Sequence, residues 1–121
     1  GELIYTPERA SGEVASKVKS HAPRIEAPST VKAGQPFELR VTVGPHPNAP
    51  GHSIRWIDVY VQEEGRPFNP VHVARVELTP TYAEPNVSLT LSLKRSSIVH
   101  VVAYCNVHGV WEGVKEVKVI G

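Results

Sequence analysis

Apolar and polar residues alternate along most of this chain, and this period of two constrains its fold more than any other feature. In Asn86–Leu93, valine or leucine occupies every second position, and polar serine or threonine fills the positions between. Successive side chains of a strand point to opposite faces, so one face can be buried while the other stays polar. The pattern therefore predicts half-buried β-strands rather than helices.

Similar segments recur between clusters of Gly, Pro, Asn and Ser, which predicts about seven strands. Their approximate ranges are 24–27, 36–43, 53–62, 71–78, 86–93, 98–104 and 110–120. This spacing is typical of an all-β fold, an immunoglobulin-like antiparallel β-sandwich. Segment 79–85 contains two prolines, so we expect it to cross between the sheets. Segment 7–19 has room for a helical turn or two.

The strand at 53–62 has apolar residues on both faces, which is typical of a central strand covered on both sides. Its alternation predicts that Ile57, Val59 and Val61 share one face and that Ile54 and Trp56 lie on the other.

The length of 121 residues suits one domain. We expect residues 21–121 to form it, with residues 1–20 as an N-terminal extension packed on it. Basic residues are scattered and the net charge is +1, which argues against nucleic acid or a membrane surface as a partner. A single cysteine excludes an internal disulfide. Together with the lack of a leader-like apolar stretch in 1–20, this predicts a cytoplasmic protein.

Two loops carry side chains that a sandwich does not need. Cys105 and His108 are three positions apart in a turn that Gly109 closes. His46 and His52 lie at the two ends of a loop rich in proline and glycine. Loops at one end of a sandwich cluster in space, and a rigid loop loses little entropy when its side chains converge. The pattern indicates a metal site.

His21 precedes the first predicted strand and can reach the same end, which brings the candidate ligands to four histidines and one cysteine. His72 and His100 lie inside strand patterns, and we interpret them as structural. Structural zinc takes four ligands, so five candidates are one too many. Iron accepts imidazoles and a thiolate at five or six positions. A blue-copper site needs fewer histidines and a weak axial methionine, and this chain contains no methionine.

Three motifs carry a resemblance to a known family. They are His21-Ala22-Pro23, then Pro45-His46-Pro47-Asn48 with Gly51-His52-Ser53-Ile54-Arg55-Trp56-Ile57, and Tyr104-Cys105-Asn106-Val107-His108-Gly109-Val110-Trp111-Glu112. With these motifs the chain resembles the one-iron superoxide reductases of the neelaredoxin type, which share a catalytic domain with desulfoferrodoxin. The resemblance extends from about His21 to Glu112.

The resemblance implies an immunoglobulin-like sandwich that holds one non-haem iron, cycling between Fe2+ and Fe3+. Its equatorial ligands would be His21, His46, His52 and His108. Cys105 would be the axial ligand, opposite an open position. The implied reaction is the one-electron reduction of superoxide to hydrogen peroxide, after which an external donor such as rubredoxin re-reduces the iron. The family also implies a homotetramer.

The chain departs from the family pattern directly before the first ligand. The family usually has Glu-Lys there, where the glutamate closes the open position after oxidation and the lysine attracts superoxide. This chain has Lys19-Ser20 instead. Lys19 is the candidate catalytic residue because its long stem can swing over the site. We expect the sixth position of the oxidised form to hold water or hydroxide, or to be empty.

Two other functions fit the residues. A cupredoxin-like copper protein would transfer electrons without turning over superoxide, and metal analysis separates it from the enzyme. An immunoglobulin-like interaction domain would hold structural zinc, and Cys105→Ser should then unfold it. For the iron centre, the geometry of the turn leads us to expect hydrogen bonds from the backbone amides of 106–108 to the Cys105 sulfur, which would tune the redox potential of the iron.

Overall fold

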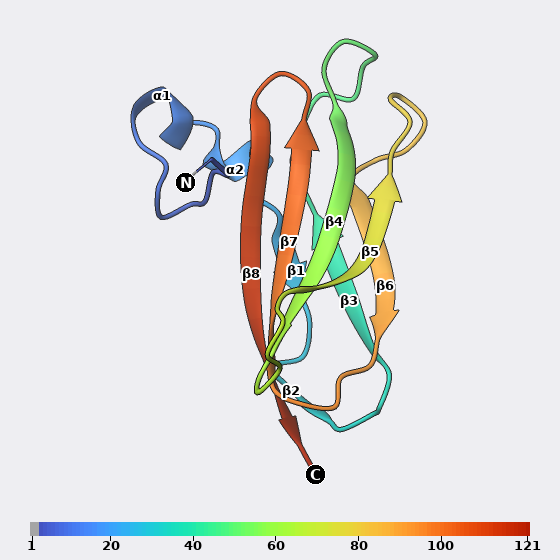
Figure 1. The fold of residues 1–121 in the computed structure, drawn as a ribbon. Coiled ribbons are helices and arrows are strands. Elements are labelled where there is room, and N and C mark those ends of the chain that lie inside the picture. The colour runs from blue at the N-terminus through green and yellow to red at the C-terminus, as the bar shows by residue number, and fades with distance from the viewer. Residues whose placement is uncertain (1–2) are drawn as a thin grey trace.

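Two β-sheets pack face to face in residues 3–121, the part of the chain that this computed structural model describes (Figure 1). One sheet has the strand order β1-β3-β6 and the other the order β2-β8-β7-β4-β5. In chain order the elements are α1 (Gly12–Ala15), α2 (Val18–His21), β1 (Arg24–Glu26), β2 (Thr30–Lys32), β3 (Phe37–Thr42), β4 (Ile54–Glu63), β5 (Val71–Glu77), β6 (Asn86–Leu91), β7 (Ser97–Cys105) and β8 (Gly109–Ile120).

The predicted all-β sandwich is confirmed, with eight strands in place of about seven. The additional strand, β2, pairs in parallel with residues 118–120 at the end of β8, and the other strand pairs are antiparallel. A strand of three residues is too short to show a period of two. Segment 79–85 crosses from β5 in one sheet to β6 in the other, as predicted. No helix in residues 3–121 is long and apolar enough to cross a membrane.

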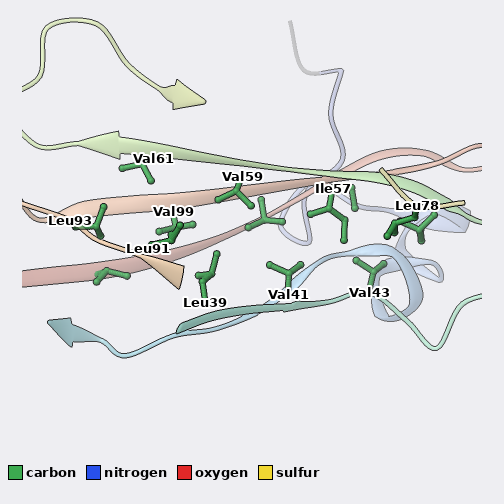
Figure 2. Packing of buried hydrophobic residues seen from close by; sticks show 14 of the residues in the cluster. Leu39, Val41, Val43, Ile57, Val59, Val61, Leu78, Leu91, Leu93 and Val99 are labelled. Atoms are coloured by element: carbon green, nitrogen blue, oxygen red, sulfur yellow. The ribbon is translucent and has the colours of Figure 1, made fainter. Parts of the chain in front are cut away.

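The core lies between the two sheets and consists mainly of the residues that the alternation predicts to point inward (Figure 2). Leu39 and Val41 of β3 face Ile57 and Val59 of β4, and all four side chains have an exposed fraction of 0%. Burying a side chain of this size contributes about 1.5–3 kcal/mol. This packing fixes the two sheets, and with them the loops at their ends.

Ile54 also belongs to the core, although the alternation predicts it on the face of Trp56. The register of β4 against β7 shifts between these two residues, so Arg55 is the extra residue of a bulge. A bulge reverses the alternation, and the prediction for Ile54 was therefore wrong. In this position Ile54 pairs with Cys105, which brings the loop that ends at Ser53 beside the cysteine turn.

The loops 43–53, 78–85 and 106–108 gather at one end of the sandwich, at the top in Figure 1. The N-terminal segment with α1 and α2 lies beside β8 near this end. Because β2 pairs only with residues 118–120, the other half of β8 would present an open edge. Tyr5 covers part of that edge through an isolated parallel bridge to Trp111.

An ion pair with one buried and one exposed partner lies on the outer face of the five-stranded sheet. Asp58 is 3% exposed, and its carboxylate accepts hydrogen bonds of 2.8 and 2.7 Å from Arg75. His72 Nε2 lies 3.2 Å from the same carboxylate, and the Arg75 guanidinium stacks 4.4 Å above the Trp56 ring. The hydrogen bonds from Arg75 hold the pKa of Asp58 below its ordinary value, and burial opposes them only in part.

We expect Asp58→Asn to lower the free energy of unfolding at neutral pH by about 2 kcal/mol, because the charge-assisted hydrogen bonds are lost. The folded-state pKa is depressed, so this contribution is present above the ordinary value of 3.8 and disappears as the pH falls through the folded pKa. Unfolding in guanidinium chloride at neutral and at strongly acidic pH measures the difference in the free energy of unfolding between Asp58→Asn and wild type. The control is Glu77→Gln, since that carboxylate is 78% exposed and lies 4.0 Å from Arg75. A difference that persists in acid contradicts the prediction.

Candidate metal centre

Four imidazole rings form a closed circle where the loops gather. Ring centroids lie 4.6 Å apart for His21 and His46, and 4.9 Å apart for His46 and His52. The circle closes through His108, at 5.2 Å from His52 and 4.8 Å from His21. Each ring is steeply inclined to its neighbours, by 61–85°. All the histidines predicted as ligands therefore meet at one place.

The sulfur of Cys105 completes this group. One ligand atom from each of His21, His46, His52 and Cys105 lies within 4.8 Å of the others. The Nδ1 atom of His108 lies 3.8 Å from the sulfur. The structure thus brings together all five residues that the sequence proposes as metal ligands.

His21 reaches the centre from outside the sandwich, as the last residue of α2. Its Nδ1 atom lies 3.0 Å from the carbonyl oxygen of Lys17 and 2.8 Å from the Ser20 hydroxyl. A carbonyl can only accept, so the ring proton is on Nδ1 and Nε2 keeps a lone pair. The chain after His21 runs close to β8, where a Cβ at Gly113 would lie 2.4 Å from the carbonyl oxygen of Pro23. Glycine at that position permits this path.

His46 is presented by a turn that requires glycine. Gly44 has φ +128°, and a Cβ there would lie 2.8 Å from the backbone nitrogen of His46. The Nδ1–H of His46 donates to the carbonyl of Pro47 at 2.7 Å, which again leaves the Nε2 lone pair free. This Nε2 lies 3.1 Å from Nε2 of His21. Two lone pairs so close repel each other unless a cation lies between them.

The cysteine turn is joined to the neighbouring loop by Asn106. Its side-chain oxygen accepts a hydrogen bond of 2.9 Å from the backbone N–H of Ser53. The amide of His108 donates to the sulfur of Cys105 at 3.3 Å, as expected for this turn. The amide of Asn106 instead donates to the carbonyl of Ser53 at 3.3 Å, so that part of the expectation was wrong. The bulge in β4 brings Ser53 close enough to accept it.

The surroundings lower the pKa of three of these imidazoles, those of His21, His46 and His108, and so favour their neutral form. The pKa of His21 is lowered to about 4, chiefly by burial and also by the nearby imidazoles, against the opposing effect of the hydrogen bond with the Lys17 carbonyl. Burial also lowers the pKa values of His46 and His108. Neutral imidazole is the form that binds a metal.

One buried nitrogen in the centre lacks a partner, and a metal ion would supply one. Nε2 of His52 is buried and has no hydrogen-bond partner among residues 3–121. A buried polar atom without a partner costs about 1–3 kcal/mol, and coordination would remove that cost. Imidazole and thiolate together suit iron, copper or zinc.

Lys17, rather than Lys19, lines a hollow beside His108. Lys19 is exposed, and its carbonyl lies 3.4 Å from the guanidinium of Arg24. The charge of Lys17 lowers the pKa of His108, after the larger effect of burial, and that of Glu13 raises it. The hollow, of about 390 Å³, is lined by Tyr5, Glu13, Val14, Lys17, Val107, His108, Gly109 and Trp111.

The sequence reasoning missed Glu13, because no motif links it to His21. The one-turn helix α1 places it at the hollow. His72 and His100 lie away from the centre, as predicted. They are 3.2 Å from Asp58 and 3.0 Å from Glu112, respectively.

Comparison with known proteins agrees with this geometry. The family model described as desulfoferrodoxin matches residues 13–114. The chain is 36% identical over 102 residues to superoxide reductase from Pyrococcus horikoshii, covering 79% of this chain and 85% of that protein. It is 33% identical over 116 residues to neelaredoxin from Megalodesulfovibrio gigas, with 84% and 88% covered. The solved structure of superoxide reductase (neelaredoxin) from Ignicoccus hospitalis has a TM-score of 0.93 and 61% identity, covering 99% of this chain and 98% of that one.

We expect the protein to bind one metal ion per chain, and His52→Ala to weaken binding by at least about 10-fold. His100→Ala is the control, since that ring is paired with Glu112 on the outer face of the sheet. Metal content after loading with iron(II) and dialysis against a chelator measures the effect. Removing the metal should also lower the melting temperature, because Nε2 of His52 loses its partner. Equal metal content in the two variants contradicts the assignment.

Proposed function

This chain belongs to the desulfoferrodoxin family, and we propose that it is a superoxide reductase of the neelaredoxin type. The observation that carries the proposal is the closed circle of four imidazoles beside the buried thiol of Cys105. A cupredoxin-like copper site uses fewer histidines and an axial methionine, which this chain lacks.

Iron is the metal that we propose for the centre, held by the four histidines and Cys105. Five protein ligands exceed what structural zinc takes, whereas iron accepts five or six. When bound, iron would supply the electron that reduces superoxide and regain it from an external donor, for which we propose a rubredoxin-like protein.

The reaction consumes one superoxide, one electron and two protons, and yields one hydrogen peroxide. The chain contributes by controlling charge around the centre. The amide of His108, 3.3 Å from the sulfur, stabilises negative charge on the thiolate and so limits how strongly Cys105 donates electrons. Carbonyl partners hold the rings of His21 and His46 in place. These contacts prepare the ligands before the metal arrives.

A lysine near the centre would attract the superoxide anion and help deliver protons. The sequence proposes Lys19, whose exposed side chain has the reach to approach the site. Lys17 is a second candidate, because it is half-buried and lines the hollow beside His108. A positive charge held at the mouth of a site raises the association rate of an anion and makes it depend on salt.

We propose that the outer face of the five-stranded sheet is covered in a homotetramer. It contains a hollow of about 740 Å³, where apolar side chains surround the ion pair of Asp58 with Arg75 and the hydrogen-bonded pair of His100 with Glu112. Val114, 54% exposed, adjoins the hollow as the cross-strand partner of His100. An apolar face with its charges already paired suits another copy of the same surface.

The reduced, iron-loaded protein should consume superoxide and form one hydrogen peroxide per superoxide. Pulse radiolysis with peroxide and dioxygen analysis measures this stoichiometry. Dioxygen release at half the superoxide consumed would indicate dismutation and contradict the proposal. A protein that purifies with copper and leaves superoxide unchanged would support the electron-transfer alternative.

The same measurement separates the two lysines. If Lys17 supplies the charge, Lys17→Ala should lower the second-order rate several-fold and flatten its dependence on ionic strength, with Lys19→Ala close to wild type. If Lys19 supplies the charge, Lys19→Ala should show the lower rate and the flatter salt dependence, and Lys17→Ala should be close to wild type. Rates and salt dependence that both variants leave unchanged would remove both lysines from the mechanism, and solvent alone would then deliver the protons.

Light scattering during size-exclusion chromatography should give a mass of four chains. Val114→Glu should reduce that mass, because it places a charge in the proposed interface. Tyr82→Glu is the control, since Tyr82 is 90% exposed and lies in the loop after β5. A monomeric wild type rules the tetramer out.

A further inference from the structure

We propose that Tyr5 is a positioning residue of the metal centre. It clamps the N-terminal segment onto β8 and supports Trp111, which in turn contacts the ring of His21 and the backbone carbonyl of His108. The inference rests on the proposed function, because it assigns a role toward the metal that this function requires.

The aromatic rings form a continuous stack that ends at a ligand. The Tyr5 ring lies 5.0 Å from the Trp111 ring at 41°. The Trp111 ring lies 5.4 Å from the His21 ring at 34°. Trp111 is 1% exposed, and its indole N–H donates to the carbonyl of His108 at 3.1 Å. One tryptophan thus contacts two proposed ligands, and Tyr5 packs against the same tryptophan.

Backbone hydrogen bonds hold Tyr5, and with it the Tyr5 ring, against β8. Its N–H donates to the carbonyl of Val110 at 3.0 Å, and its carbonyl accepts from the N–H of Glu112 at 2.8 Å. These bonds use the edge of β8 that β2 does not cover. The ring also lies over Gly109, where a Cβ would be 3.5 Å from Cε2 of Tyr5. Gly109 has φ +86° and closes the turn that links Cys105 to β8. The Tyr5 ring therefore packs on this turn.

The clamp also determines where the charges of the extension lie. After Tyr5 the chain turns through hydrogen bonds from Arg9 and Ala10 to the carbonyl of Thr6, at 3.1 Å each. It then enters α1 and returns to the centre at α2. Glu13 and Lys17 line the hollow together with the Tyr5 ring. Releasing Tyr5 would free one end of this segment, while His21 anchors the other.

Three variants test the inference. Tyr5→Ala removes the ring, Tyr5→Phe retains it without the hydroxyl, and Tyr82→Ala removes a tyrosine that is 90% exposed elsewhere. Tryptic cleavage after Arg9, Lys17 or Lys19 reports whether the segment stays docked. Loss of iron(II) to a chelator reports on the ligands independently of activity. The salt dependence of the superoxide rate reports on the charges.

We expect Tyr5→Ala to be cleaved faster, to release iron about 10-fold faster and to show a weaker salt dependence, with the melting temperature little changed. Tyr5→Phe and Tyr82→Ala should match wild type in all three. Faster cleavage with unchanged iron release and salt dependence would overturn the inference, and so would a Tyr5→Phe variant that behaves like Tyr5→Ala. A wild type that binds iron but does not reduce superoxide would instead contradict the proposed function, and iron release would still test Tyr5.

Discussion

Two imidazole nitrogens held lone pair to lone pair are the constraint on which this structure depends. The carbonyls of Lys17 and Pro47 each accept a hydrogen bond from the Nδ1–H of a histidine. Nε2 of His21 and Nε2 of His46 therefore carry no proton and face each other at 3.1 Å. Such a contact is repulsive, and the neighbouring Nε2 of His52 is buried without a partner. Both unfavourable features are relieved when a cation binds to these nitrogens. The fold holds its ligands in the metal-binding form in advance, so little reorganisation is needed when the metal enters.

The ligands come from two sources with different structural requirements. The sandwich supplies His46, His52 and the cysteine turn from loops fixed by the core, and the bulge at Arg55 brings two of these loops together. His21 comes from outside the sandwich, on a one-turn helix too short to be stable alone. Its position therefore depends on the carbonyl of Lys17, on the close approach at Gly113 and on the Trp111 ring.

The fold and the residues that meet at the candidate metal centre could be predicted from the sequence because both leave local patterns. Alternation in 86–93 indicates a strand without reference to its neighbours, and the Cys105 and His108 pair is visible at a spacing of three. The parts that were missed depend on long-range pairing. The parallel partner of β2 is more than 80 residues away, at 118–120, and the bulge that turns Ile54 inward shows only in the register with β7. No local motif singles out Lys17 or Glu13, and the path of the chain through α1 places both beside His108.

The division between the sandwich and the N-terminal extension separates the chemistry at Cys105 from the charges that attract an anion. The thiol of Cys105 and the amide that stabilises its charge belong to the cysteine turn, so they are fixed by the sandwich. Glu13 and Lys17 belong to the extension, which meets the sandwich at Tyr5 and at His21. A change of charge in residues 6–19 would therefore alter the attraction of an anion and, at Glu13 or Lys17, also the pKa of His108. Because electrostatic attraction requires a charge near the mouth of a site rather than at one fixed atom, we propose that a lysine at another position of the extension takes the place of the lysine of the Glu-Lys pair.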